Sequence, residues 1–184
     1  MHKVFISGSM SIKNIDSNVI ERLNNIISSQ YEIIVGDADG VDSSIQNLLK
    51  EKHTENVTVY CVGDAPRNNI GCWSVEKVKT IEKPGTRAFF TAKDLKMAES
   101  CDYGLMIWDT KSTGTLSNAI ELLKRNKYSL VYINKTKEFF KIKNAEDLET
   151  LLSYMSDSAF IKADEKLKLK RQIEIFKNRQ TILF

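Results

Sequence analysis

Short apolar runs alternate with amphipathic segments along most of this chain, and this alternation limits the possible folds more than any other feature. Each apolar run is far shorter than the roughly 20 residues that span a bilayer, and polar residues or glycine follow it. Apolar positions at spacings of three and four then indicate a helix before the next run. We therefore predict an α/β fold with a Rossmann-like, mostly parallel sheet of about five strands and helices on both faces. The predicted strands cover residues 4–6, 31–35, 57–62, 102–108 and 129–133.

The pattern changes near residue 135. We expect residues 1–135 to form a Rossmann-like nucleotide-binding domain and residues 136–184 to form a C-terminal extension packed on it. That extension should contain an edge strand over residues 138–142 and a helix capped by Asn144. A final amphipathic helix over about residues 164–180 is also expected.

The segment between residues 63 and 87 holds both prolines and three of the eight glycines. It predicts a long loop with a short helix near residues 74–81, and long loops inside compact domains are usually functional or mobile. Arg67 and Arg87 bracket this loop, and either could hold a phosphate through two parallel hydrogen bonds. Most surface arginines have no such role.

Composition is typical of a soluble globular protein, with 42% hydrophobic and 28% charged residues. The net charge of +3 is too small to indicate nucleic-acid binding by itself, although residues 162–184 hold seven lysines and arginines against three acids. A solvated helix face explains that excess more simply than a partner surface does. Three sparse cysteines without a C-x-x-C pair, and the lack of room for a signal peptide, predict a cytoplasmic protein. No metal site is expected, because His2 and His53 have no partner pattern.

Polar residues and glycine follow three of the predicted strands and lead directly into predicted helices. In an open parallel sheet, ligands bind beyond the carboxyl ends of the strands, where the chain changes direction. These loops converge on one crevice if the first, second and fourth predicted strands are neighbours. The free N–H groups and the dipole at a helix N-terminus favour a phosphate there. The predicted ligand or phosphate site comprises Ser7, Gly8, Ser9, Gly36, Asp39, Gly40, Asp42, Arg87, Ser112, Thr113, Gly114 and Thr115.

The loop at residues 112–115 gives the most specific prediction of a phosphate-binding loop. Gly114 would let a ligand approach the backbone closely, and a positive φ there would make valine unfavourable. The alternative is that Ser112 or Thr113 only caps the next helix, and Asp42 could likewise be only a helix cap. Neither G-x-G-x-x-G nor G-x-x-x-x-G-K-[ST] occurs, so the usual dinucleotide fingerprint and the P-loop are both disfavoured.

Two motifs resemble a known superfamily. Ser7-Gly8-Ser9 after the first strand is similar to the opening of the SLOG superfamily and of the related nucleoside deoxyribosyltransferases. Gly36-Asp37-Ala38-Asp39-Gly40-Val41-Asp42 resembles the G-x-A-x-G-[AV]-D motif of the YspA-like SLOG proteins.

A third motif extends the resemblance, which covers about residues 3–133. Asp94 and Met97, then Cys101-Asp102, lead into the segment at residues 107–115 and are similar to the last motif of both groups. The resemblance implies a Rossmann-like, YspA-like or LOG-like protein that binds a nucleotide or nucleotide-derived ligand. It also implies that one wall of the site is shaped by Gly36, Gly40 and Asp42. The phosphate would be held by Ser112, Gly114 and Thr115.

One position departs from the family pattern. Hydrolytic and transferase members usually carry a glutamate three residues after the threonine of the Gly-Thr pair, and this carboxylate assists cleavage of the N-glycosidic bond. Asn118 occupies that position here, and an amide cannot act as the nucleophile or base. Glu121 lies one helical turn later. The catalytic residues therefore stay unassigned, with Asp94, Asn118 and Glu121 as candidates.

We expect this protein to bind a nucleotide or nucleotide-derived small molecule at the carboxyl ends of the strands. One alternative is an N-glycosidic hydrolase or transferase that acts on a nucleoside or nucleotide. Another is a DNA-binding protein similar to the DNA-processing SLOG members. Nucleic acid is therefore a possible partner, but a small-molecule ligand is favoured over it. No cofactor and no membrane partner are expected, and self-association into a homo-oligomer is left open.

Overall fold

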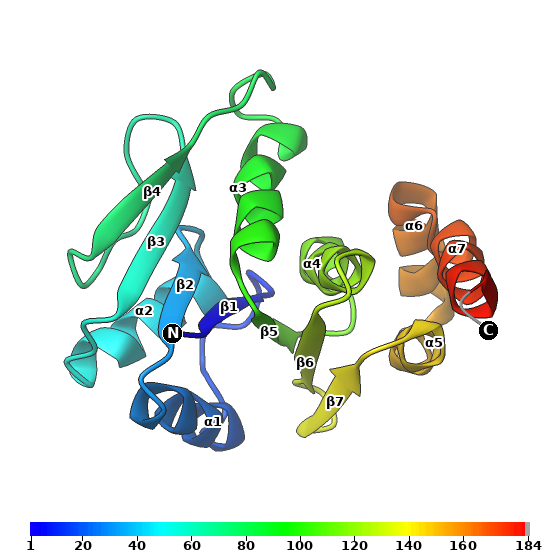
Figure 1. Ribbon diagram of the computed structural model, residues 1–184, viewed down its shortest axis with the longest axis horizontal. Coiled ribbons are helices and arrows are strands. Elements are labelled where there is room, and N and C mark those ends of the chain that lie inside the picture. Colours follow the sequence, from blue (N-terminus) through cyan, green and yellow to red (C-terminus); the bar gives the residue numbers. More distant parts are fainter. Residues whose placement is uncertain (183–184) are drawn as a thin grey trace.

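The computed structural model describes residues 1–182, and its seven strands form a single sheet (Figure 1). The strands are β1 (Lys3–Gly8), β2 (Glu32–Gly36), β3 (Val57–Val62), β4 (Ser74–Val78), β5 (Tyr103–Trp108), β6 (Tyr128–Ile133) and β7 (Glu138–Ile142). Their order across the sheet is β4-β3-β2-β1-β5-β6-β7. All neighbouring pairs are parallel except β6 and β7, which are antiparallel. This arrangement confirms the α/β, Rossmann-like fold.

Seven helices accompany the sheet and cover both of its faces (Figure 1). They are α1 (Ser17–Ser28), α2 (Val41–Glu51), α3 (Arg87–Ser100), α4 (Thr113–Lys124), α5 (Ala145–Leu152), α6 (Asp157–Leu167) and α7 (Leu169–Ile182). The buried side chains of α1 and α2 pack on one face, and those of α3, α4 and the three C-terminal helices belong to the core on the other face.

The central strands are apolar on both faces because helices bury both faces, as is usual for parallel strands. Phe5 of β1 and Ile34 of β2 are paired in register and pack on the side of α3 and α4. Ile6, Ile33 and Val35 point the opposite way, toward α1 and α2. All five side chains are fully buried.

The sheet reverses its direction of growth between β1 and β5. From β1 the chain adds β2, β3 and β4 on one side, and from β5 it adds β6 and β7 on the other. The first, second and fourth predicted strands are therefore the neighbours β1, β2 and β5, as the predicted crevice requires. Their carboxyl ends meet at the switch point, where open parallel sheets bind ligands.

The predicted helix near residues 74–81 is wrong, because this segment forms the edge strand β4 and pairs with β3. Val75 and Val78 lie three residues apart, which resembles helical spacing. In a strand this spacing places them on opposite faces, and both are half-buried because each face of this edge is partly covered. With β4 and the confirmed edge strand β7, the sheet has seven strands rather than about five.

The C-terminal extension also differs from its prediction. Asn144 caps α5 as expected, since its Oδ1 accepts a hydrogen bond from the N–H of Asp147 at 2.8 Å. The single helix predicted over residues 164–180 is wrong, because α6 ends at Leu167 and α7 starts at Leu169 in a new direction (Figure 1). Lys168 has a left-handed φ of 54° that interrupts the helix. Leu169 of α7 is fully buried, and α7 packs against α5 and α6.

Within the described part of the chain, none of the helices has the length and apolar character needed to cross a membrane. The three cysteines are free thiols, with Cys61 and Cys101 buried and Cys72 exposed.

Candidate ligand site at the carboxyl edge of the sheet

The loops after β1, β2 and β5 line a common crevice with a volume of about 360 Å³. Helix α3, which packs against α4, contributes polar, charged and aromatic side chains to the crevice wall. The predicted site residues that line the crevice are Ser7, Gly8, Asp42, Arg87, Ser112, Thr113, Gly114 and Thr115. The structure therefore brings the three predicted loops together at one place.

The N-terminus of α4 opens onto this crevice. Ser112 caps the helix, with its Oγ accepting a hydrogen bond from the N–H of Thr115 at 3.4 Å. Asp109 Oδ1 accepts from the N–H of Ser112 at 2.7 Å and fixes the loop. Among residues 1–182, no acceptor bonds the backbone N–H of Thr113 or Gly114. Ser112 thus does cap the helix, and the N–H groups of Thr113 and Gly114 have no acceptor among the described residues, so both could also bind an anion.

The expectation of a positive φ at Gly114 is wrong. Gly114 lies in the first turn of α4 with a φ outside the left-handed region, because the helix begins at Thr113 rather than at Leu116. A Cβ built at this position would have only Ser112 Oγ nearby, at 3.9 Å. A side chain at position 114 would therefore extend into the crevice without disturbing the fold.

The β1 loop is held by buried contacts. A Cβ at Gly8 would lie 2.4 Å from the carbonyl oxygen of Ile107 and 2.7 Å from the Val41 side chain, so only glycine fits. Ser9 is fully buried, and its Oγ accepts from the N–H of Asp109 at 3.1 Å and lies 3.3 Å from Thr115 Oγ1. Ser9 therefore joins the β1 and β5 loops and is not part of the crevice wall.

Three predicted residues of the β2 loop do not line the crevice. A Cβ at Gly36 would lie 2.3 Å from Asp42 Oδ2, so this glycine makes room for the Asp42 carboxylate. Gly40 has a φ of 77° and caps α2, which contradicts the interpretation of Asp42 as the cap. Asp39 is exposed and accepts a hydrogen bond from Asn68 Nδ2 at 3.1 Å.

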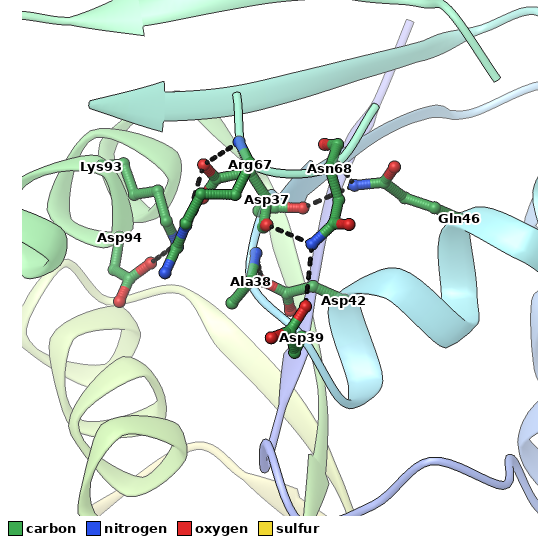
Figure 2. Close-up of polar contacts among 10 residues, drawn as sticks. Asp37, Ala38, Asp39, Asp42, Gln46, Arg67, Asn68, Lys93 and Asp94 are labelled. Carbon is green, nitrogen blue, oxygen red and sulfur yellow. Dashed lines mark hydrogen bonds and ion pairs between the residues drawn. The ribbon is translucent and has the colours of Figure 1, made fainter. Parts of the chain in front are cut away.

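An ion pair joins the β2 loop to the long loop before β4 (Figure 2). Arg67 donates to both carboxylate oxygens of Asp37, from Nη2 at 2.7 Å and from Nε at 3.2 Å. Burial acts to raise the pKa of Asp37, but the Arg67 hydrogen bonds outweigh it and the pKa is lowered. The Arg67 guanidinium also lies 4.6 Å from the centre of the Phe90 ring. Arg67 is therefore already engaged by Asp37 on one side of the crevice.

A second charged group lies deeper in the same wall (Figure 2). Lys93 of α3 is only 4% exposed, and its Nζ lies 2.7 Å from Asp94 Oδ1. Burial acts to lower the pKa of Lys93, but Asp94 and Asp42 outweigh it and the pKa is raised. Lys93 therefore keeps its positive charge at neutral pH.

Asp42 is the most unusual group of this wall. It is 3% exposed, and burial raises the pKa of its carboxyl to about 7. Its Oδ2 accepts a hydrogen bond from the N–H of Ala38 at 3.3 Å. Its Oδ1 is buried and has no hydrogen-bond partner among the described residues. A perturbed carboxyl beside a buried ammonium group is typical of functional sites.

The three catalytic candidates lie in different surroundings. Asp94 and Asn118 both line the crevice, and Asn118 Nδ2 donates to Ser7 Oγ at 3.2 Å. Glu121 is absent from the crevice wall and forms ion pairs with Arg125 and Lys124 instead.

Several residues at this site were not predicted from the sequence, among them Asp37, Phe90, Thr91 and Lys93. The inward position of Lys93 could have been predicted, because Lys93 lies four residues before the apolar Met97 and therefore on the same face of α3. Phe90 has no predicted element or role, although Thr86 is recognisable from the sequence as the cap of a helix that starts at Arg87. Within residues 1–182, no three His, Cys, Asp or Glu side chains gather closely enough to hold a metal ion.

No family model and no curated protein matches this chain. A solved structure of DNA processing protein A from Helicobacter pylori has a similar fold, with a TM-score of 0.51 and 17% sequence identity. The match covers 71% of this chain and 64% of that chain, so this chain spans less than two thirds of the length of its structural neighbour. That protein binds single-stranded DNA. At this identity the likeness concerns the fold alone.

Proposed function

We propose that this protein binds a nucleotide or a nucleotide-derived small molecule in the crevice at the carboxyl ends of β1, β2 and β5. The observation that carries the proposal is the convergence of three loops and a free helix N-terminus on one cavity of about 360 Å³. That volume lies in the range of small-molecule pockets. The SLOG-like motifs at residues 7–9, 36–42 and 112–115 support the same proposal, because they supply these loops.

Different groups of the crevice wall would bind the phosphate, the sugar and the base of such a ligand. The free N–H groups of Thr113 and Gly114 would hold a phosphate at the positive end of α4. Arg87 is exposed at the start of α3 and would reach the same phosphate from the other side. Ser7, Asn118 and Asp94 would donate to or accept from the sugar hydroxyls. Phe90 offers an aromatic surface for the base.

Binding without rapid turnover fits this wall better than N-glycosidic catalysis. An amide stands at position 118, and its Nδ2 is occupied by Ser7. Asp94 is the remaining candidate carboxylate at the crevice, and it already pairs with Lys93. An attacking carboxylate needs to be free to approach the sugar carbon.

The experiment is a calorimetric titration of the protein with a panel of nucleoside monophosphates. Gly114→Val should abolish binding of whichever nucleotide the wild type binds, because the new side chain would fill the place of the phosphate. Thr115→Ala should weaken binding by about 1 kcal/mol, or by more if its hydroxyl meets a charged phosphate. Circular dichroism would verify that both variants are folded.

Ser17→Val is the matched control for Gly114→Val, since it places the same side chain in the first turn of α1, where the residue is exposed and outside the crevice. The control should bind nucleotides as the wild type does. A folded Gly114→Val variant with unchanged affinity would refute the phosphate site and leave the loop as a helix cap.

Single-stranded DNA is a second candidate ligand, because the structural neighbour binds it. The basic helix α7 is not the surface that we would choose for it, since none of its described side chains lines the crevice. Retention on immobilised oligonucleotide that falls steeply with added salt would support this candidate. Retention that is absent at low salt would exclude it.

A further inference from the structure

A second hollow of about 540 Å³ lies beside the crevice, between the neighbouring helices α4 and α6. Three lysines line it: Lys111 from the loop before α4, and Lys162 and Lys166 from one face of α6. None of the three forms an ion pair with an acid in the described part of the chain. Among the described residues, no carboxylate lines the hollow. Three like charges are thus gathered without a counter-charge.

Two helix N-termini add to this positive field. The first turn of α4 contributes Thr113 and Gly114 to the wall, and the first turn of α6 contributes Ser158 and Ala159. Ser156 caps α6, with its Oγ accepting from the N–H of Ala159 at 3.3 Å. Both helices therefore present their positive ends and several hydroxyl groups to the same space. The chemistry of this wall fits an anion.

The hollow is connected to the crevice through Gly114. This residue lines the crevice, the hollow and a smaller space of about 310 Å³ between them. Lys166 lines both the hollow and that smaller space, which Arg87 and Asn118 border on the crevice side. A ligand held in the crevice could therefore extend past Gly114 to the three lysines.

We infer that the hollow binds the distal phosphates of the ligand, so that the ligand is a nucleoside di- or triphosphate rather than a monophosphate. The inference rests on the proposed function, which places the nucleoside in the crevice. A short phosphate chain fits better than a nucleic-acid strand, because the basic residues of α7 do not continue the charge of the hollow. Lys170 lies 6.0 Å from the centre of the Phe160 ring, and Lys177 pairs with Glu149. Neither lines the hollow.

The test compares AMP, ADP and ATP, and the corresponding guanosine, cytidine and uridine series, by calorimetric titration at constant ionic strength. The double variant Lys162→Gln/Lys166→Gln removes two charges of the hollow and keeps good helix-forming residues. Its matched control is Lys50→Gln/Lys52→Gln, which removes two exposed charges at the end of α2, near the amino edge of the sheet. Lys111→Gln is a second variant outside α6.

Wild type and control should bind the di- or triphosphate about tenfold to a hundredfold more tightly than the monophosphate, as charge-assisted hydrogen bonds provide. The double variant should bind the monophosphate like the wild type and lose most of that gain, and Lys111→Gln should lose part of it.

Monophosphate binding without any gain from further phosphates, or a gain that persists in the double variant, would overturn the inference and leave the proposed function intact. A panel in which no nucleotide binds would refute both. Tight, lysine-dependent binding of an oligothymidylate with no phosphate-dependent gain among nucleotides would overturn the inference in favour of nucleic acid.

Discussion

Replacing Asp42 by asparagine should change how the stability of this protein depends on pH. Asp42 is buried in the crevice wall, and this burial raises the pKa of its carboxyl from 3.8 to about 7. The neighbouring Asp94 also raises this pKa, whereas Lys93 and the N–H of Ala38 lower it. The attraction to Lys93 is thus already included in the value of about 7.

The direction of this pH dependence follows from whether the folded or the unfolded state holds the Asp42 proton. Between about pH 4 and pH 7 the folded protein keeps the Asp42 proton, while the unfolded chain has released it. Stability of the wild type should therefore fall as the pH rises through this range. The rise in pKa from 3.8 to about 7, at about 1.36 kcal/mol for each pH unit, gives a loss of about 4 kcal/mol above pH 7. An asparagine side chain does not titrate, so the Asp42→Asn variant should gain about this much relative to the wild type across the same range.

Urea unfolding at half-unit pH steps measures both curves, and their difference isolates the effect of Asp42. Asp37 and Asp109 have lowered pKa values, so they contribute stability that is lost as the pH falls below about 4. Both groups are present in both proteins and cancel in the difference. Asp64→Asn, an exposed site, is the control and should follow the wild type. Parallel curves for Asp42→Asn and wild type would refute the buried, protonated state of this carboxyl.

Two further predictions test the loops and the chemistry. Gly8→Ala should lower the free energy of unfolding by about 1–3 kcal/mol, because its methyl group would lie 2.4 Å from the carbonyl oxygen of Ile107. Gly114→Ala should leave the free energy of unfolding unchanged or raise it by up to about 1 kcal/mol, because the space there is open and alanine favours helix. Urea unfolding of both variants tests this. A Gly114→Ala variant less stable than Gly8→Ala would contradict the packing described for these loops. Release of free base from nucleoside monophosphates should be far slower than roughly 1 s⁻¹, because Asn118 replaces the expected carboxylate. Turnover at that rate, lost in Asp94→Asn, would instead identify Asp94 as the catalytic acid.

Most of the parallel sheet could be predicted from the sequence because its strands are buried on both faces. Such strands appear as continuous apolar runs, as residues 33–35 and 105–108 do, and the polar loops after them mark their ends. The edge strand β4 has no such run, since solvent covers much of both its faces and only Val75 and Val78 are half-buried. The break at Lys168 was also hidden, because no glycine or proline marks it.

The loops of the site could be predicted, but the charged part of its wall could not. Glycines after β1, β2 and β5 are visible in the sequence, and the neighbouring strands place them at one edge of the sheet. The pairing of Asp37 with Arg67 joins residues 30 positions apart across a long loop whose path no local pattern determines. Lys93 and Asp42 are brought together only by the packing of α3 against the sheet, which lies beyond sequence periodicity.

The free-energy cost of burying Asp42 and Lys93 indicates that folding alone does not explain why these groups lie in the crevice wall. Buried charges are often less favourable than apolar residues of similar size, and Asp42 has an oxygen without a partner among the described residues. Gly36 is adapted to the same pair, since a Cβ there would lie 2.3 Å from Asp42 Oδ2 and 2.8 Å from Lys93 Nζ. Three positions from β2, α2 and α3 are thus matched to keep a carboxyl and an ammonium group beside the crevice. Proteins depart from local stability rules mainly at functional sites, so this matching supports a ligand at the crevice independently of the phosphate loop.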